Sequence, residues 1–101
     1  MNLENRVIAV VGLGYVGLPL AIEYGKKYRV IGFDVNKARV AELEAGEDHT
    51  LEADLAGMAQ ARALFEESSG VKGLSFSACA DDLVQANTYI VTVPTPIDRF
   101  N

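Results

Sequence analysis

The chain has 101 residues, half of them hydrophobic, which is enough for one domain with a core. Nine Lys and Arg against fourteen Asp and Glu give a net charge of −5, which argues against nucleic acid or an anionic membrane surface as a partner. The single cysteine argues against a disulfide framework. No apolar run nears the ~20 residues that span a bilayer, and no signal peptide is visible. We therefore expect a protein of the reducing cytoplasm.

The first third of the chain alternates strand, helix and strand. Arg6 to Val11 is short, continuous and rich in β-branched residues, which predicts a fully buried strand. From Tyr15 to Lys27 the pattern is helical, with Val16, Leu20 and Tyr24 spaced four apart. Arg29 to Phe33 has the pattern of a second buried strand, which ends at Asp34.

Two helices are expected next. Asn36 is a good N-cap for a helix over Lys37 to Ala45 that Gly46 ends. Its inward residues would be Val40 and Leu43.

The second of these helices is predicted from Leu51 to Glu67, with Thr50 as a possible cap. Its inward stripe would consist of Leu51, Leu55, Met58 and Phe65. Arg62 interrupts this stripe.

The last elements are a strand over Leu74 to Ser77, a short helix over Asp81 to Ala86 and a buried strand over Thr88 to Val93. Strands that alternate with helices predict an α/β fold, a Rossmann-type doubly wound parallel sheet. Right-handed crossovers favour the strand order 3-2-1-4, with the last strand beside the first. We expect residues 1–101 to form one domain. Because PTPIDRFN follows the last strand without a closing element, we also expect the chain to be a fragment of a longer protein.

Three glycines follow the first strand in GLGYVG, residues 12–17. Backbone N–H groups at a helix N-terminus can bind a phosphate without a cation, provided that no Cβ blocks the approach. Gly12 would make the tight turn, Gly14 would admit a pyrophosphate, and Gly17 would let the helix pack closely. With a strand before and a helix after, the pattern predicts dinucleotide binding.

The cofactor is predicted to be NAD. Asp34 lies 22 residues after Gly12, at the end of the second strand. A carboxylate there can accept both hydroxyls of the adenosine ribose and would repel a 2′-phosphate. Lys37 and Arg39 leave NADP open, because either cation could pair with that phosphate.

Other interpretations of these residues remain. The glycines could turn a corner in an α/β domain that binds nothing. An acid at the end of the second strand would also suit S-adenosylmethionine in a methyltransferase. A non-catalytic nucleotide-sensing module is a further alternative.

The chain resembles the UDP-glucose/GDP-mannose dehydrogenase family. VGLGYVGLPLA followed by VIGFDVN is similar to the family's opening, and VPTP, residues 93–96, matches its short motif at the end of the fourth strand. The resemblance implies a cytoplasmic enzyme that oxidises the C6 hydroxymethyl of a nucleotide sugar to a carboxylate with two NAD+, for capsule or other surface polysaccharides. The parent enzyme would be a homo-oligomer.

The resemblance also implies which residues bind NAD. Val16 and its flanking glycines would lie on the pyrophosphate, and Asp34 would bind the adenosine ribose. Arg39 would be a basic cofactor contact, and Thr95 would lie near the nicotinamide. The full set of expected cofactor-binding residues is Gly12, Leu13, Gly14, Tyr15, Val16, Gly17, Asp34, Arg39, Pro94 and Thr95.

The segment after the second helix bears on the sugar. Glucose-acting members commonly have glycine, two residues, then Pro-Ile-x-Glu, whereas residues 46–52 here read GEDHTLE. This departure looks more like members that act on UDP-N-acetyl-hexosamines. The sugar would bind through downstream domains.

Catalysis is expected outside this chain, so the 101 residues alone would be inactive. The family's thiol nucleophile, lysine and aspartate belong to downstream domains. Cys79 is predicted to be a partly buried packing residue, and His49 a solvated loop or capping residue. No metal site is predicted.

Overall fold

A computed structural model describes residues 6–14, 16–47 and 55–92 of the chain. Eight elements follow one another within these described residues. They are β1 (Val7–Val11), α1 (Gly17–Gly25), β2 (Arg29–Phe33), α2 (Lys37–Glu44), α3 (Leu55–Glu67), β3 (Gly73–Ser77), the short 3₁₀ helix η2 (Ala80–Gln85) and β4 (Thr88–Val91).

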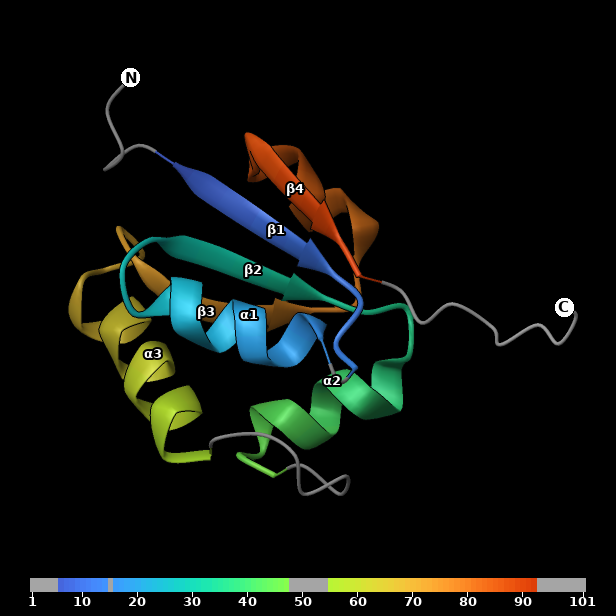
Figure 1. Cartoon of the computed structure of the whole chain (residues 1–101), viewed down its shortest axis with the longest axis horizontal. Helices are drawn as coiled ribbons and strands as arrows, with labels where there is room; N and C mark the ends of the chain where they lie inside the picture. Colours follow the sequence, from blue (N-terminus) through green and yellow to red (C-terminus); the bar gives the residue numbers. More distant parts are fainter. Residues whose placement is uncertain (1–5, 15, 48–54, 93–101) are drawn as a thin grey trace, which may run out of the picture.

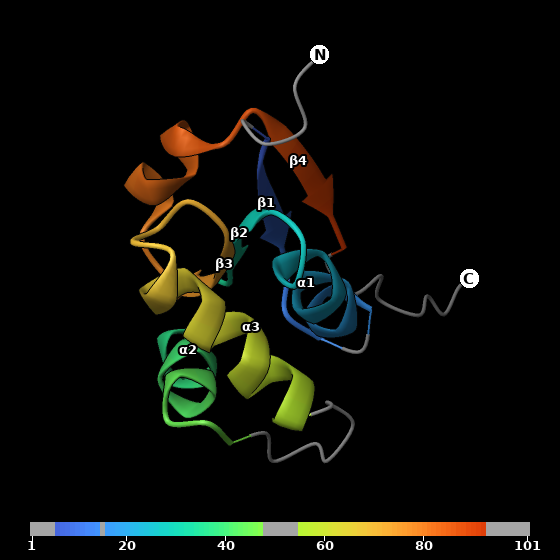
Figure 2. The ribbon, with the colours of Figure 1, turned by 90° about the vertical axis from the view of Figure 1, so that its left-hand side faces the viewer.

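The four strands form one parallel sheet in the order β3-β2-β1-β4, which confirms the predicted α/β fold and strand order (Figure 1). The helices α1, α2 and α3 lie on one side of the sheet, and η2 lies on the other (Figure 2). Because all strands run in the same direction, the residues that follow β1, β2 and β4 meet at one edge. The glycines and Asp34 therefore come together there.

The core lies between the sheet and the helices α1, α2 and α3. On α1, Leu18, Ala21 and Ile22 are at most 2% exposed and face the strands. The four-residue spacing that predicted this helix marks a different face, since Val16 is 61% exposed and Leu20 is only half-buried. The helix was predicted correctly, but its buried stripe is rotated from the one that the spacing marked.

The start and end of α2 confirm the sequence prediction. The Asn36 side chain caps the helix by accepting a hydrogen bond from the Arg39 N–H at 3.1 Å. Val40 and Leu43 are buried. Gly46 follows the helix with φ +81°, a conformation that favours glycine at this position.

The inward stripe predicted for α3 is partly wrong. Met58 is buried as expected, but Leu55 is 41% exposed. Ala61 is fully buried instead, close to Gly25 of α1. Small residues let the two helices approach closely, which a search for large apolar side chains misses. Thr50 and Leu51 lie outside the described residues.

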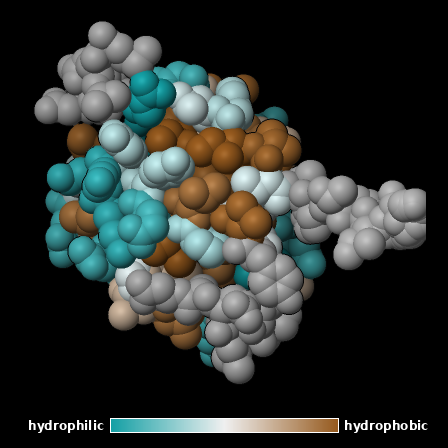
Figure 3. Space-filling view, viewed as in Figure 1, coloured by the Kyte–Doolittle hydropathy of each residue, from teal (hydrophilic) through white to brown (hydrophobic). Residues whose placement is uncertain are grey.

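The sheet keeps apolar surface near β4. On the face that carries α1, hydrophobic residues gather over β1 and β4 (Figure 3). Ile90 of β4 packs against the core on this face. Tyr89 and Val91, which are 53% and 66% exposed, alternate to the opposite face, where the Tyr89 hydroxyl donates to the Leu83 carbonyl of η2. The prediction of a buried last strand is therefore wrong. Monomeric domains rarely leave such surface uncovered without a partner element. Among the described residues, none of the helices has both the length and the hydropathy needed to cross a membrane.

Candidate functional site

Gly12 makes the turn out of β1. Its φ is +102°, which strains any residue with a Cβ, and its N–H donates to the Phe33 carbonyl at 2.8 Å. Gly12 thus makes the tight turn that the sequence predicted, and the turn is anchored to the end of β2.

Gly17 allows close packing at the start of α1. A Cβ built on it would lie 1.7 Å from the Gly12 carbonyl oxygen and 2.3 Å from the Thr92 hydroxyl oxygen. Real Cβ atoms never come this close. The protein's own packing therefore requires glycine at position 17. The atoms that a Cβ would meet belong to Gly12 and to Thr92, the residue after β4, rather than to the strands.

Gly14 differs from the other two glycines of the loop. Its φ does not lie in the left-handed region, and a Cβ built on it would meet no atom of the described chain within 4 Å, apart from its neighbours in sequence. Nothing in the described fold therefore requires glycine here. An open position beside a glycine turn is what the close approach of a ligand would require.

The N-terminus of α1 adjoins this open position. Val16 is the N-cap and makes no side-chain capping hydrogen bond. In the first turn of α1 the Leu18 N–H donates to the Gly14 carbonyl at 3.2 Å and Pro19 has no N–H, so the attraction for an anion rests mainly on the helix dipole. The glycine loop and α1 together suit a phosphate group.

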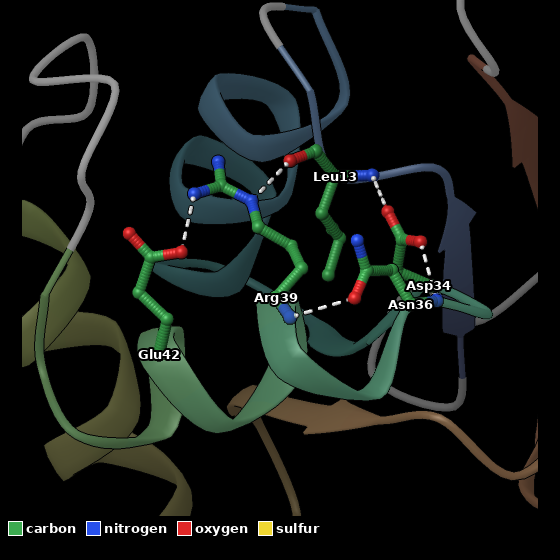
Figure 4. A network of polar contacts seen from close by, with 5 residues as sticks. All are labelled: Leu13, Asp34, Asn36, Arg39 and Glu42. Carbon is green, nitrogen blue, oxygen red and sulfur yellow. Dashed lines mark hydrogen bonds and ion pairs between the residues drawn. The ribbon is translucent and has the colours of Figure 1, made fainter.

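Asp34 ties the glycine loop to the end of β2 (Figure 4). Its Oδ2 accepts a hydrogen bond from the Leu13 N–H at 3.0 Å, and its Oδ1 accepts one from the Asn36 N–H at 2.9 Å. Each carboxylate oxygen has two lone pairs, so both oxygens keep capacity for a hydroxyl donor. Asp34 is half-buried at the sheet edge, where it can serve the loop and a ribose together.

Arg39 lies beneath the loop. Its Nε donates to the Leu13 carbonyl oxygen at 3.0 Å, and its Nη1 lies 3.4 Å from Glu42 Oε1 (Figure 4). The side chain is 10% exposed. Lys37, by contrast, is exposed on the first turn of α2. The Arg39 guanidinium is therefore committed to the loop and to a carboxylate.

Thr92 was missed by the sequence analysis. It follows β4, and its hydroxyl lies 2.9 Å from the Gly12 carbonyl oxygen, which accepts the hydrogen bond. Its N–H donates to the Val11 carbonyl at 2.8 Å. The pairing of β4 with β1, together with a threonine at the strand end, was the signal that could have identified it.

Several predicted residues fall outside the described chain, namely Tyr15, His49, Pro94 and Thr95. Cys79 is described, and the prediction that it is partly buried is wrong, since it is exposed after β3. Across residues 6–14, 16–47 and 55–92, no three His, Cys, Asp or Glu side chains gather as metal ligands would.

A hollow of about 610 Å³ lies elsewhere, between the end of α2, α3 and β3. On its wall, Arg62 donates to the carbonyls of Leu43 and Glu44, and its guanidinium lies 5.7 Å from the centre of the Phe76 ring. Through these contacts Arg62 connects α3 to the C-terminal end of α2. The glycine loop contributes no residue to this hollow.

Comparisons with known proteins agree with the geometry. Residues 6–101 match the model of the UDP-glucose/GDP-mannose dehydrogenase family, NAD binding domain. The chain is 54% identical over 97 residues to a UDP-N-acetyl-D-glucosamine 6-dehydrogenase of Pseudomonas aeruginosa, with 96% of this chain and 21% of that protein covered. A protein of the same description from Salmonella typhi is 45% identical over 99 residues, with 98% and 21% covered.

A solved structure is also similar. The structure of a UDP-D-ManNAc dehydrogenase from Pyrococcus horikoshii superimposes with a TM-score of 0.71 at 34% identity, over 92% of this chain and 21% of that one. The chain thus spans about a fifth of the length of the curated relatives that it matches.

Replacing Gly17 tests the packing at the start of α1. Helix propensity alone would favour alanine by about 1 kcal/mol. The clash with the Gly12 carbonyl should outweigh this gain, so we expect Gly17→Ala to lose about 3 kcal/mol of unfolding free energy. Urea denaturation followed by circular dichroism measures the change. A wild-type midpoint would contradict the close packing described here.

Proposed function

The chain belongs to the UDP-glucose/GDP-mannose dehydrogenase family, as its NAD-binding domain, and on this premise we propose that it serves an enzyme that oxidises the C6 hydroxymethyl of a UDP-sugar to a carboxylate. When bound, NAD+ supplies the hydride acceptor, two molecules for each sugar. The remaining length of the relatives, about four fifths, would carry the sugar site and the catalytic residues. The exposed apolar surface of β4 supports further structure packing against this domain.

The observation that carries this proposal is the open position at Gly14. We propose that the pyrophosphate lies there, against the backbone of residues 12–17 and the N-terminus of α1. The start of α1 supports this placement, because the helix dipole favours an anion there. The residues present therefore fit the cofactor.

Asp34 is proposed to bind the hydroxyls of the adenosine ribose. Both of its oxygens retain lone pairs beyond the Leu13 and Asn36 hydrogen bonds. Two features favour NAD over NADP. The Asp34 charge would repel a 2′-phosphate, and the Arg39 guanidinium is already engaged by Leu13 and Glu42.

The other expected residues complete the proposed site. Tyr15, Pro94 and Thr95 are assigned to it through the family motifs that contain them, and Arg39 is assigned to a place beneath the loop. The catalytic nucleophile is proposed to lie in downstream domains, so the 101 residues alone should not oxidise a sugar. The enzyme is proposed to be a cytoplasmic homo-oligomer.

The sugar is proposed to be a UDP-N-acetyl-hexosamine, used for surface polysaccharide. Two observations support this choice. Residues 46–52 lack the Pro-Ile pair of glucose-acting members. The relatives described above include UDP-N-acetyl-D-glucosamine 6-dehydrogenases and a UDP-D-ManNAc dehydrogenase.

Gly14→Ala tests the proposed place of the pyrophosphate. Because the added methyl group meets no described protein atom, we expect the unfolding free energy to change by less than about 1 kcal/mol. The same methyl group would occupy the place of the cofactor, so NADH affinity should fall about tenfold or more. Calorimetric titration with NADH and urea denaturation measure the two effects. Unchanged affinity in the folded variant would place the cofactor elsewhere.

Asp34→Ala tests the choice of cofactor. The variant removes the charge that opposes a 2′-phosphate, so the ratio of the Kd for NADPH to the Kd for NADH should fall about tenfold. The ratio is informative because loosening of the loop would weaken both cofactors alike. Asp81→Ala is the matched control, since Asp81 is exposed on η2 and carries the same charge. If the Asp34 variant keeps the wild-type ratio, Asp34 does not select NAD.

A further inference from the structure

Side chains hold the peptide groups of Leu13 on both sides. Its N–H donates to Asp34 Oδ2 at 3.0 Å, and its carbonyl oxygen accepts from Arg39 Nε at 3.0 Å. Its side chain is buried in the core at 1% exposure. Leu13 directly precedes the open position at Gly14, so the same contacts determine where the Gly14 backbone lies.

Glu42 determines where the Arg39 guanidinium lies. The two side chains are 15% and 10% exposed, and Glu42 Oε1 is 3.4 Å from Arg39 Nη1. They are one turn apart on α2, whose start is fixed by the Asn36 cap. A guanidinium this deeply buried needs a counter-charge and hydrogen-bond acceptors in fixed directions. Glu42 provides the charge, and the Leu13 carbonyl provides an acceptor.

We propose that Arg39 and Glu42 form a positioning pair for the glycine loop. Glu42 orients the guanidinium, Arg39 Nε holds the Leu13 carbonyl, and the loop is thereby set in the shape that admits the cofactor. This inference rests on the proposed cofactor site. It assigns Glu42 a role in cofactor binding, and it has Arg39 act through the loop backbone rather than as a cation on a phosphate.

Two variants separate these roles. Glu42→Gln keeps the size of the side chain and removes its charge. Arg39→Lys keeps the charge but lacks a planar fork that can hold the Leu13 carbonyl and Glu42 together. If Arg39 acts through the loop, both variants should bind NADH about fivefold more weakly, with the NADH-to-NADPH preference unchanged. If it acts as a cation on the cofactor, lysine should substitute for it.

The second readout needs no cofactor. Amide hydrogen exchange of Leu13, followed by NMR in the full 101-residue chain, reports on the loop directly. Both variants should speed this exchange several-fold, whereas the Gly12 amide, which donates to Phe33, should change less. Glu44→Gln is the matched control, because Glu44 is exposed on the same helix and the substitution is the same. It should leave exchange and affinity at wild-type values.

Each result bears on one proposal. Wild-type Leu13 exchange in both folded variants, or wild-type NADH affinity in Arg39→Lys, would overturn the positioning pair. Faster exchange in the variants of a chain that binds no NADH would overturn the proposed cofactor site and leave the control of the loop by Arg39 and Glu42 standing. Faster exchange together with weaker NADH binding would support both.

Discussion

The site depends on how the Leu13 peptide is held at the edge of the sheet. The parallel order β3-β2-β1-β4 places the end of β2 beside the end of β1, so Asp34 reaches the Leu13 N–H. The Asn36 cap then starts α2 at the register that brings Arg39 to the Leu13 carbonyl. Backbone hydrogen bonds of a glycine-rich loop would otherwise be easily exchanged for water. Here Asp34 and Arg39 hold both groups of the Leu13 peptide, so the loop is tied to the fold at this residue.

The three glycines of the loop show how one motif combines structural and functional constraints. Gly12 is required by its positive φ and Gly17 by a carbonyl and a hydroxyl that leave no room for a Cβ. Gly14 has neither reason within the described chain. A fold needs the first two whether or not it binds a ligand, so only the third is informative about function. The glycine motif thus combines two residues that the fold requires, Gly12 and Gly17, with one that is left open for a ligand, Gly14.

The fold, the glycines of the loop and Asp34 could be predicted from local patterns. Short β-branched runs gave the strands, alternation with helices and the right-handed crossover gave their order, and Asn36 and Gly46 gave the bounds of α2. The missed features all depend on tertiary contacts. Leu55 is exposed because small residues such as Ala61 line the buried face of α3, and Thr92 acts only because β4 pairs with β1. The hydrogen bond from Arg39 to the Leu13 carbonyl joins residues 26 apart, so no local pattern reveals it, although the spacing of Arg39 and Glu42 on α2 is local.

We expect NAD+ to bind against Gly14 while Asp34 and Arg39 keep their hydrogen bonds to the Leu13 peptide. A crystal structure of this chain with NAD+ tests it most directly. The pyrophosphate should lie against Gly14, with Asp34 and Arg39 hydrogen-bonded to the two sides of Leu13. A loop that has released the Leu13 carbonyl or N–H, or a dinucleotide bound away from Gly14, would contradict it.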